Sequence, residues 1–474
     1  MNRARNIPWH AAVGGAALFW WSCALCFLAA RSVPGGETPQ PAGFDVRPGF
    51  TVISSVCELR DCLAASGQRI RLKPGTYSIT NAEPDRKTVV HVQGNDNYFD
   101  LRGVTLQLDT QILGALRGKV HELCVYRVPG SRLTFEGAVF EDVGDTPPYQ
   151  SLSEFGVEGS HNTFKDCTFI IRGSAPYGYG DLFGKGAGAK VRLQKHAALS
   201  VHADNTRILG CRFFIHTFGH AIHMHGAQNT LIQDTYVEGE LRLSDEILAE
   251  KDGPAAKRGY KDLYDRPIPK GVMICLAEDG IRAYLDGGRE KPLPRTGDIT
   301  VINCTVKRMR GGIALELASG KVVVRGCTVT ESGYPGAAYG VPSRALVRDC
   351  RGDAAYTPLL HLGYSHKQSA DIELELIDSV PGLGNDLLAL INGSGHKVTL
   401  TPSHAGPHSN DLAIAVGKTY RADQADVGKT SARDIRLSNG TPHRVVLSPD
   451  CSGCNVRSVG PVTNDGKSNT VERF

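Results

Sequence analysis

The chain has 474 residues, of which 22% are charged, and a formal net charge of +4 at pH 7. This balance excludes a polycation built to bind nucleic acid, and the chain has neither a phosphate-binding glycine loop nor a dinucleotide fingerprint, so we expect no nucleic acid and no nucleotide as partner. The 54 glycines and 25 prolines favour short strands separated by turns over long amphipathic helices.

The first 32 residues have the layout of an export signal. Arg3 and Arg5 precede an apolar run from Ala11 to Ala30 that ends in small residues. We therefore predict that residues 1–32 are a signal peptide, removed on export to the periplasm or the medium. The apolar run approaches the length that spans a bilayer, so an N-terminal membrane anchor is the alternative. Residues 33–48 are predicted to be a disordered spacer.

A repeat built around one cysteine column follows. The windows NTFKDCTFI, NTRILGCRFF, NTLIQDTYV, DITVINCTV, KVVVRGCTV and RALVRDCRG align on a cysteine or its substitute, and Cys304, Cys327 and Cys350 are 23 residues apart. Equivalent thiols at this spacing predict an interior stack of small side chains rather than a metal site. A strand, a turn and a second strand repeated with this period predict an all-β fold, a single parallel β-helix.

The other cysteines are interpreted from their spacing. The 44 residues between Cys167 and Cys211 are taken as two coils of 22. Two pairs lie close together in sequence and are candidates for local disulfides. These pairs are Cys57 with Cys62, and Cys451 with Cys454.

Two apolar columns flank the cysteine column and are predicted to point into the solenoid. The first lies three residues before it and consists of Phe164, Ile208, Ile232, Val301, Val324 and Val347. The second lies two residues after it and consists of Phe169, Phe213, Val237, Val306 and Val329.

The start of the repeat carries a family resemblance. ELRDCLAAS, near residue 60, has helical character and precedes QRIRLKPGTYSITN, in which Ile70 and Leu72 alternate before a Pro-Gly turn. These residues resemble the capping helix and first coil of pectate-lyase-like proteins. The resemblance implies a right-handed parallel β-helix over residues 49–450 with a short N-terminal capping helix, then a C-terminal cap or tail over residues 451–474. It selects no activity, because this scaffold carries lyases, hydrolases, epimerases and adhesins.

Two long insertions single out one coil. They run from Arg172 to His202 and from Glu240 to Lys270, and the coil between them contains HTFGHAIHMHG. Insertions of this kind wall the binding face of a solenoid. We therefore expect the functional site at this coil, which contains His216, His220, His223 and His225.

Matching strands across coils orients these histidines. If Ile222 lies over Ile313 and Met224 over Leu315, period-2 alternation turns His223 and His225 outward. The preceding coil, KHAALSVHA, turns Ser200 and His202 outward, so His202 is expected beside His225. Glu316 continues the column of His225, and His361 falls in the column of His223 several coils away.

Three interpretations of the histidines remain open. They can form a solvated polar ladder. They can bind a metal, with His202, His223 and His225 joined by Glu238 or Glu240. One of them can act as a general base or acid, because the pKa of imidazole lies near neutral pH.

Basic residues beside the cluster favour an acidic polysaccharide as the partner. Lys185, Lys190, Arg192 and Lys195 precede the cluster and Arg242 follows it, so a polyanion would be attracted to the groove. We assign substrate binding to three of these cations together with His220 and Glu316. The three cations are Lys185, Lys190 and Arg192.

The sequence can supply each role of a polysaccharide lyase acting on a uronic-acid polymer by β-elimination. His202, His223 or His225 would serve as base, Lys195 or Arg242 would neutralise the developing negative charge, and a tyrosine would protonate the leaving oxygen. The tyrosine candidates are Tyr177 and Tyr179.

The resemblance also implies a possible calcium ion, since pectate-lyase-like enzymes often use calcium to neutralise charge. The candidate ligands are carboxylates near and within the second insertion. They are Asp245, Glu246 and Glu250, whereas Glu238 and Glu240 are the carboxylates of the metal site considered at the histidines.

Two alternatives to the lyase remain. A glycoside hydrolase would need two carboxylates about 5 to 9.5 Å apart. Its candidates are Glu238, Glu240, Asp245, Glu246, Glu278, Asp279 and Glu316. The other alternative is a non-catalytic surface β-helix that binds glycan or protein. We expect a monomer in each case.

Overall fold

The computed structural model describes residues 47–80, 87–118, 123–173, 194–257, 259–261, 267–285, 295–334, 336–364, 366–377, 385–403, 412–418 and 430–474. The expected signal peptide and nearly all of the expected spacer lie outside these ranges, so both remain predictions. Within the ranges, no helix is long and apolar enough to cross a bilayer.

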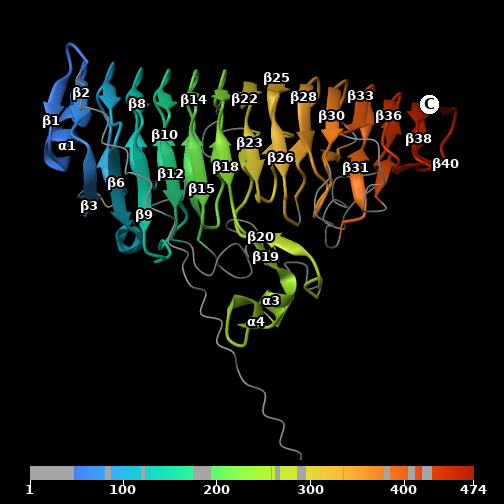
Figure 1. Ribbon diagram of the computed structural model, residues 1–474, viewed down its shortest axis with the longest axis horizontal. Coiled ribbons are helices and arrows are strands. Elements are labelled where there is room, and N and C mark those ends of the chain that lie inside the picture. Colours follow the sequence, from blue (N-terminus) through green and yellow to red (C-terminus); the bar gives the residue numbers. More distant parts are fainter. Residues whose placement is uncertain are drawn as a thin grey trace, which may run out of the picture. The chain divides into compact units, whose positions relative to one another are not determined.

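The described chain is a right-handed parallel β-helix, as predicted (Figure 1). Each central coil contributes one strand to each of three parallel ladders, and two of these ladders merge into a single sheet of 23 strands at β28. Every backbone group of a strand can thereby pair with the coils on either side, which a single coil could not achieve.

The bounds of the strands follow this three-ladder order. The first ladder consists of β1 (Thr51–Ile53), β2 (Arg69–Leu72), β5 (Tyr98–Asp100), β8 (Thr134–Glu136), β11 (Thr163–Lys165), β14 (Arg207–Leu209), β17 (Leu231–Gln233), β22 (Gly297–Ile302), β25 (Ser319–Arg325), β28 (Leu346–Gly352), β30 (Asp371–Leu376), β33 (Lys397–Pro402), β36 (Arg436–Asn439), β39 (Asn455–Ser458) and β41 (Thr470–Arg473). The second consists of β3 (Gly75–Ile79), β6 (Val104–Asp109), β9 (Val139–Val143), β12 (Thr168–Ile171), β15 (Arg212–Ile215), β18 (Tyr236–Glu238), β23 (Thr305–Lys307) and β26 (Thr328–Thr330).

The third ladder is a separate sheet of 13 strands, called here the thirteen-stranded sheet. It consists of β4 (Val90–His91), β7 (Cys124–Val128), β10 (Leu152–Val157), β13 (His196–Val201), β16 (Ile222–Met224), β21 (Ile281–Ala283), β24 (Ile313–Ala314), β27 (Tyr339–Gly340), β29 (Leu360–Leu362), β31 (Leu387–Ile391), β34 (Ala413–Val416), β37 (Arg444–Leu447) and β40 (Val462–Asn464). A small sheet at the C-terminal coils consists of β32 (Gly393–Ser394), β35 (Ala432–Arg433) and β38 (Cys451–Ser452).

The predicted capping helix is present as α1 (Val56–Ala64). The side chain of Ser55 accepts a hydrogen bond from the backbone N–H of Glu58, which satisfies one of the free donors at the start of the helix. Leu59 and Leu63 are buried in the core at the first coils. The helix therefore covers apolar surface that the first coil would otherwise expose. A short 3-10 helix, η1 (Thr110–Ala115), follows β6.

Both predicted apolar columns are confirmed by the strand register. The first runs unbroken from Phe164 to Val347, and the second from Phe169 to Val329. The rings of Phe169 and Phe213 stack with centroids 4.5 Å apart. The stacked columns form one continuous core along the solenoid.

The turn before the cysteine column explains the sequence of the repeat. One residue in each turn has a positive φ, a conformation that only glycine adopts freely and that asparagine and aspartate tolerate. These residues are Asp166, Gly210, Asp234, Asn303, Gly326 and Asp349. The cysteine that follows is buried, and its thiol reaches a carbonyl of the neighbouring coil, as Cys167 does with Phe135 (3.4 Å).

Two expectations from cysteine spacing were wrong. Thr168 pairs directly with Arg212, so the 44 residues from Cys167 to Cys211 form one coil, lengthened by the first insertion, and not two. The expected disulfides are also absent, because all cysteines among the described residues are free thiols.

The solenoid extends past the expected boundary at residue 450. β39 pairs with β36, β40 with β37 and β41 with β39, all in parallel. The stretch expected to be a cap or tail therefore adds strands to the same ladders.

The second insertion and the strand that follows it form a small folded unit. It contains an antiparallel strand pair, β19 (Leu241–Leu243) and β20 (Met273–Cys275), with α3 (Ser244–Leu248) and α4 (Pro254–Lys257) between them (Figure 1). Its own apolar cluster consists of Ile247, Ala255, Ile268, Val272 and Ile274.

Candidate functional site

The histidine cluster lies on the thirteen-stranded sheet, on the side away from the core. Ser200 in β13 pairs in register with His223 in β16. The rings of His202 and His225 stack with centroids 5.6 Å apart. The predicted proximity of His202 and His225 is therefore confirmed.

The strand that pairs with β16 on the next coil is β21, whereas the sequence pattern aligned Ile222 directly with Ile313. Ile222 pairs with Ile281, and Ile281 pairs with Ile313, so Ile222 and Ile313 share a column but are not direct neighbours. The outward column predicted to join His223 and His361 is confirmed, with Arg282 next to His223.

Arg282 and Tyr284 thus join the histidines. The ring of Tyr284 stacks on that of His225, with centroids 4.3 Å apart. The guanidinium of Arg282 lies 5.2 Å from the centre of the Tyr284 ring and also bonds to the carboxylate of Glu316. Glu316 therefore lies close to the cluster, and its backbone carbonyl accepts a hydrogen bond from Lys367 (2.7 Å).

Two buried carboxylates lie just before β21 and hold the cations of the site. The amine of Lys195 donates to Glu278 (2.5 Å), and the guanidinium of Arg310 donates two hydrogen bonds to Asp279 (2.9 and 2.7 Å). Arg310 also lies 3.5 Å from Glu278, and Arg282 lies 3.6 Å from Asp279. Both carboxylates are nearly inaccessible, so these ion pairs are shielded from solvent.

The contacts of His220 define its tautomer. The backbone N–H of Asp279 donates to Nδ1 (3.0 Å), so the ring proton of the neutral imidazole is on Nε2. Nε2 lies 2.7 Å from the hydroxyl of Tyr284 and 3.1 Å from Glu278. With Nε2 donating to it, the phenol keeps its own proton free to donate elsewhere. His220 was assigned to substrate binding, but it is a buried member of this network.

Together, burial and nearby charges lower the pKa values of both Glu278 and His220. Burial opposes ionisation of Glu278, but the charges of His220, Lys195 and Arg310 outweigh it and lower the pKa to about 2. Burial lowers the pKa of His220 to about 4, although the negative charges of Glu278 and Asp279 oppose this shift. His220 is therefore uncharged near neutral pH. The cations Lys195 and Arg310 then keep Glu278 ionised.

Burial and nearby charges also shift the pKa values of His223 and Tyr284. Burial lowers the pKa of His223 well below its usual range, and the neighbouring histidines lower it further, so this imidazole is neutral. Burial raises the pKa of Tyr284 far above its usual range, and the charge of Glu278 adds to this. The site therefore combines neutral imidazole, protonated phenol and permanent cations.

Several predicted residues do not join this network or cannot be compared with it. Arg242 pairs with Glu250 (2.8 Å) and Glu246 (3.4 Å) in the second insertion. Five predicted residues lie outside the described residues. They are Tyr177, Tyr179, Lys185, Lys190 and Arg192.

The four carboxylates expected to bind a metal ion do not form a common site. Glu238 accepts from the hydroxyl of Tyr236 (2.6 Å), and Glu240 bonds to His216. Asp245 accepts from the backbone N–H of Gly271 (2.6 Å), and Glu246 pairs with Arg242. Among the described residues, these carboxylates do not belong to any group of three close potential ligands.

Arg282, Tyr284 and Arg310 were missed by sequence reasoning. A signal was present, because Ile281 and Ala283 alternate with Arg282 and Tyr284 in the same way that Ile222 and Met224 alternate with histidines. The second insertion separates the two strands in sequence, and β21 has no cysteine column beside it to guide the alignment.

No protein-family model matches the chain, and no curated protein matches it. Among solved structures, it is similar to a PL6 alginate lyase in complex with a trisaccharide, with 11% identity, a TM-score of 0.50, and 88% of this chain and 87% of that chain covered. A second alginate lyase, in complex with G6, shows 14% identity, the same coverage and a TM-score of 0.44. PfbA, a surface adhesin of Streptococcus pneumoniae, shows 11% identity, the same coverage and a TM-score of 0.36. At such an identity the likeness to the first of these structures shows the fold alone, which is a parallel β-helix.

Proposed function

We propose that this protein is a polysaccharide lyase that cleaves an acidic, uronic-acid polysaccharide by β-elimination. The observation that carries the proposal is the network on the thirteen-stranded sheet, in which His225 stacks on Tyr284 and Arg282 adjoins both Tyr284 and His223. β-Elimination needs a base, a proton donor and positive charge within the span of one sugar residue, and these three groups supply them.

Each group suits one step of the reaction. An imidazole, His225 foremost, removes the proton beside the uronate carboxylate. Arg282 neutralises the charge that develops on that carboxylate, with Lys195 adding to the positive potential. Tyr284 donates its proton to the departing glycosidic oxygen, since its high pKa keeps the phenol protonated and His220 donates to the phenol oxygen. Base and acid act from one side of the sugar.

The carboxylates favour a lyase over a hydrolase. Hydrolysis needs one carboxyl group protonated and a second one ionised across the glycosidic bond. Glu278 and Asp279 are both held ionised by cations, and Glu316 is bound by Arg282. None of these groups is therefore suited to protonate a leaving oxygen.

The calcium expected from the family resemblance has no role in this scheme. The carboxylates expected to bind a metal ion contact separate protein groups, so no step is assigned to calcium. Export to the periplasm or the medium, with removal of residues 1–32, remains part of the proposal, because a large acidic polysaccharide would be met outside the cytoplasm.

The test offers the purified protein alginate, pectate, glucuronan and glycosaminoglycans. Ultraviolet absorbance reports the unsaturated product of a lyase, and a reducing-end assay reports any chain cleavage. We expect both signals on at least one polymer. Reducing ends without absorbance would replace the lyase by a hydrolase, and binding without cleavage would leave a glycan-binding β-helix. His91→Ala is the matched control for histidine variants, because His91 lies on the same sheet several coils from the cluster.

A further inference from the structure

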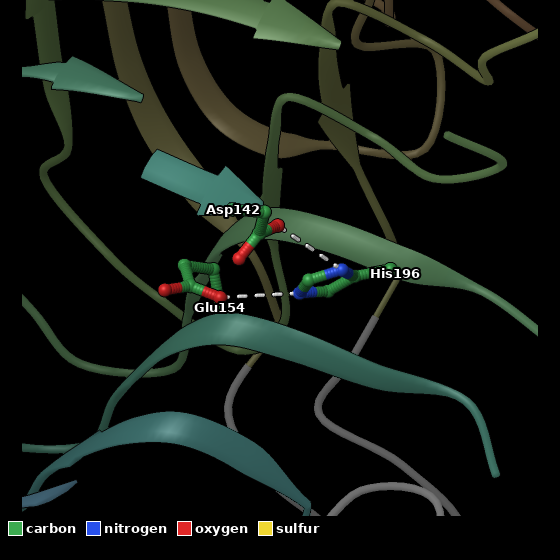
Figure 2. Close-up of side chains that lie close together, drawn as sticks. All are labelled: Asp142, Glu154 and His196. Carbon is green, nitrogen blue, oxygen red and sulfur yellow. Dashed lines mark hydrogen bonds and ion pairs between the residues drawn. The ribbon is translucent and has the colours of Figure 1, made fainter. Parts of the chain in front are cut away.

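Three polar side chains meet inside the solenoid, away from the network described above. They are Asp142 of β9, Glu154 of β10 and His196 of β13, each with no more than 2% of its surface exposed. Figure 2 shows both carboxyl groups directed at the imidazole, one toward each ring nitrogen.

These residues interrupt apolar columns. Asp142 pairs with Leu108 of the preceding coil, and His196 pairs with Leu152. Both leucines are buried in the main core. A leucine at either position would have continued the core, so the polar groups lower stability unless a partner compensates for their burial.

The hydrogen bonds do not satisfy every polar atom of the three groups. Nδ1 of His196 lies 2.5 Å from the carbonyl of Arg172, which can only accept, so Nδ1 carries a proton. The lone pair of Nε2 is then directed at the carboxyl group of Glu154 at 3.2 Å, so it accepts a hydrogen bond only while that carboxyl group is protonated. Oδ2 of Asp142 accepts from the backbone N–H of Arg172 (2.8 Å), but Oδ1 is buried without a hydrogen-bond partner.

Among the described residues, the ion pairs of these two carboxyl groups are with His196, at 3.5 Å for Asp142 and 3.2 Å for Glu154. A divalent cation between the three groups would allow both carboxyl groups to ionise, face the lone pair of Nε2 and give Oδ1 of Asp142 a partner.

We propose that Asp142, Glu154 and His196 form a buried structural site for a divalent transition metal ion, with Zn²⁺ as the best match. One potential ligand atom from each residue lies within 4.8 Å of the other two. One imidazole nitrogen and two carboxylate oxygens are ligands that Zn²⁺ accepts, and a carbonyl bonded to the other ring nitrogen is the usual support for a metal-binding histidine. A metal ion at this site would link β9, β10 and β13, which belong to neighbouring coils. This proposal does not depend on the proposed lyase activity.

The experiment measures metal content and thermal stability of the full chain. The protein is stripped with a chelator, incubated with Zn²⁺ or Mn²⁺, desalted, and analysed by inductively coupled plasma mass spectrometry and by calorimetry. We expect about one Zn²⁺ per chain and a higher Tm after loading, because an ion that binds only the folded state stabilises it.

Variants separate this site from the surface histidines. Asp142→Leu restores the aliphatic column and should fold without retaining the ion, while the double variant His202→Ala/His225→Ala should retain it. Asp142→Asn serves if the leucine variant does not fold, as judged by circular dichroism. Wild-type protein that stays folded but retains no Zn²⁺ or Mn²⁺ would overturn the proposal, as would an ion retained by both Asp142 variants.

Discussion

The imidazole of His225 stacks on the phenol ring of Tyr284, with ring centroids 4.3 Å apart and ring planes 11° apart. The two residues are separated in sequence by the whole second insertion, yet they occupy equivalent positions on adjacent coils. The stack brings a candidate base and a candidate acid into contact, and the predictions for activity depend on it.

Tyr284→Phe should lower kcat by about 100-fold or more while KM changes little, because it removes only the proton donor. The ring remains available to stack on His225, and Nε2 of His220 keeps Glu278 at 3.1 Å. Initial rates on the polymer cleaved by the wild type provide the measurement. Tyr236→Phe is the control, since Tyr236 contacts Glu238 on another ladder. Full activity of Tyr284→Phe would rule out this tyrosine as the acid.

His225→Ala should abolish activity and leave Tm nearly unchanged. The side chain points away from the core and packs against other rings of the site, so little core packing is lost. Paired activity and calorimetry measurements test this, with His91→Ala measured alongside. A large fall in Tm would instead favour a structural role for the histidine ladder.

Glu278 should make the protein sensitive to acid. Its pKa is about 2 in the folded state and lies near 4.5 when unfolded, so its contribution to stability is complete above pH 4.5 and is lost as the pH falls toward 2. The contribution is of the order of 3 kcal/mol. Urea unfolding at pH 7 and at pH 3, compared between the wild type and Glu278→Gln, measures the part of this contribution that is lost by pH 3, about 2 kcal/mol.

The variant Glu278→Gln tests the same carboxyl group by removing its charge. It should flatten the stability change between pH 4.5 and 2, and lower stability at pH 7 by about 3–5 kcal/mol, since Lys195 and Arg310 lose a buried partner. Glu158→Gln is the control, because Glu158 pairs with Arg127 near the surface. An unchanged acid profile in Glu278→Gln would contradict the assignment.

Cysteine labelling should follow burial. In the native protein, iodoacetamide should modify Cys57, which is exposed, and spare Cys327, which is fully buried. Denaturation without reductant should then expose Cys451 and Cys454 as free thiols. Peptide mass spectrometry locates the labels. If Cys451 and Cys454 are alkylated only after reduction, they form a disulfide after all.

The sequence by itself determined the solenoid and its register. An inward column such as Phe164 to Val347 is visible because each coil repeats the same alternation around a turn that needs aspartate, asparagine or glycine. The same alternation oriented His202 and His225 correctly, since a strand turns alternate side chains to opposite faces whatever surrounds it.

Only the tertiary structure decided which coils are adjacent across the insertions. The sequence spacing placed Ile222 over Ile313, whereas β21 lies between them and brings Arg282 and Tyr284 to the histidines. Arg242 lies close to the cluster in sequence but pairs with acids of its own insertion. Asp142, Glu154 and His196 lie on three strands and share no motif, so their convergence follows from how the coils close around the core. Local alternation is a property of each strand, but contacts between distant residues depend on the path of the chain that connects them.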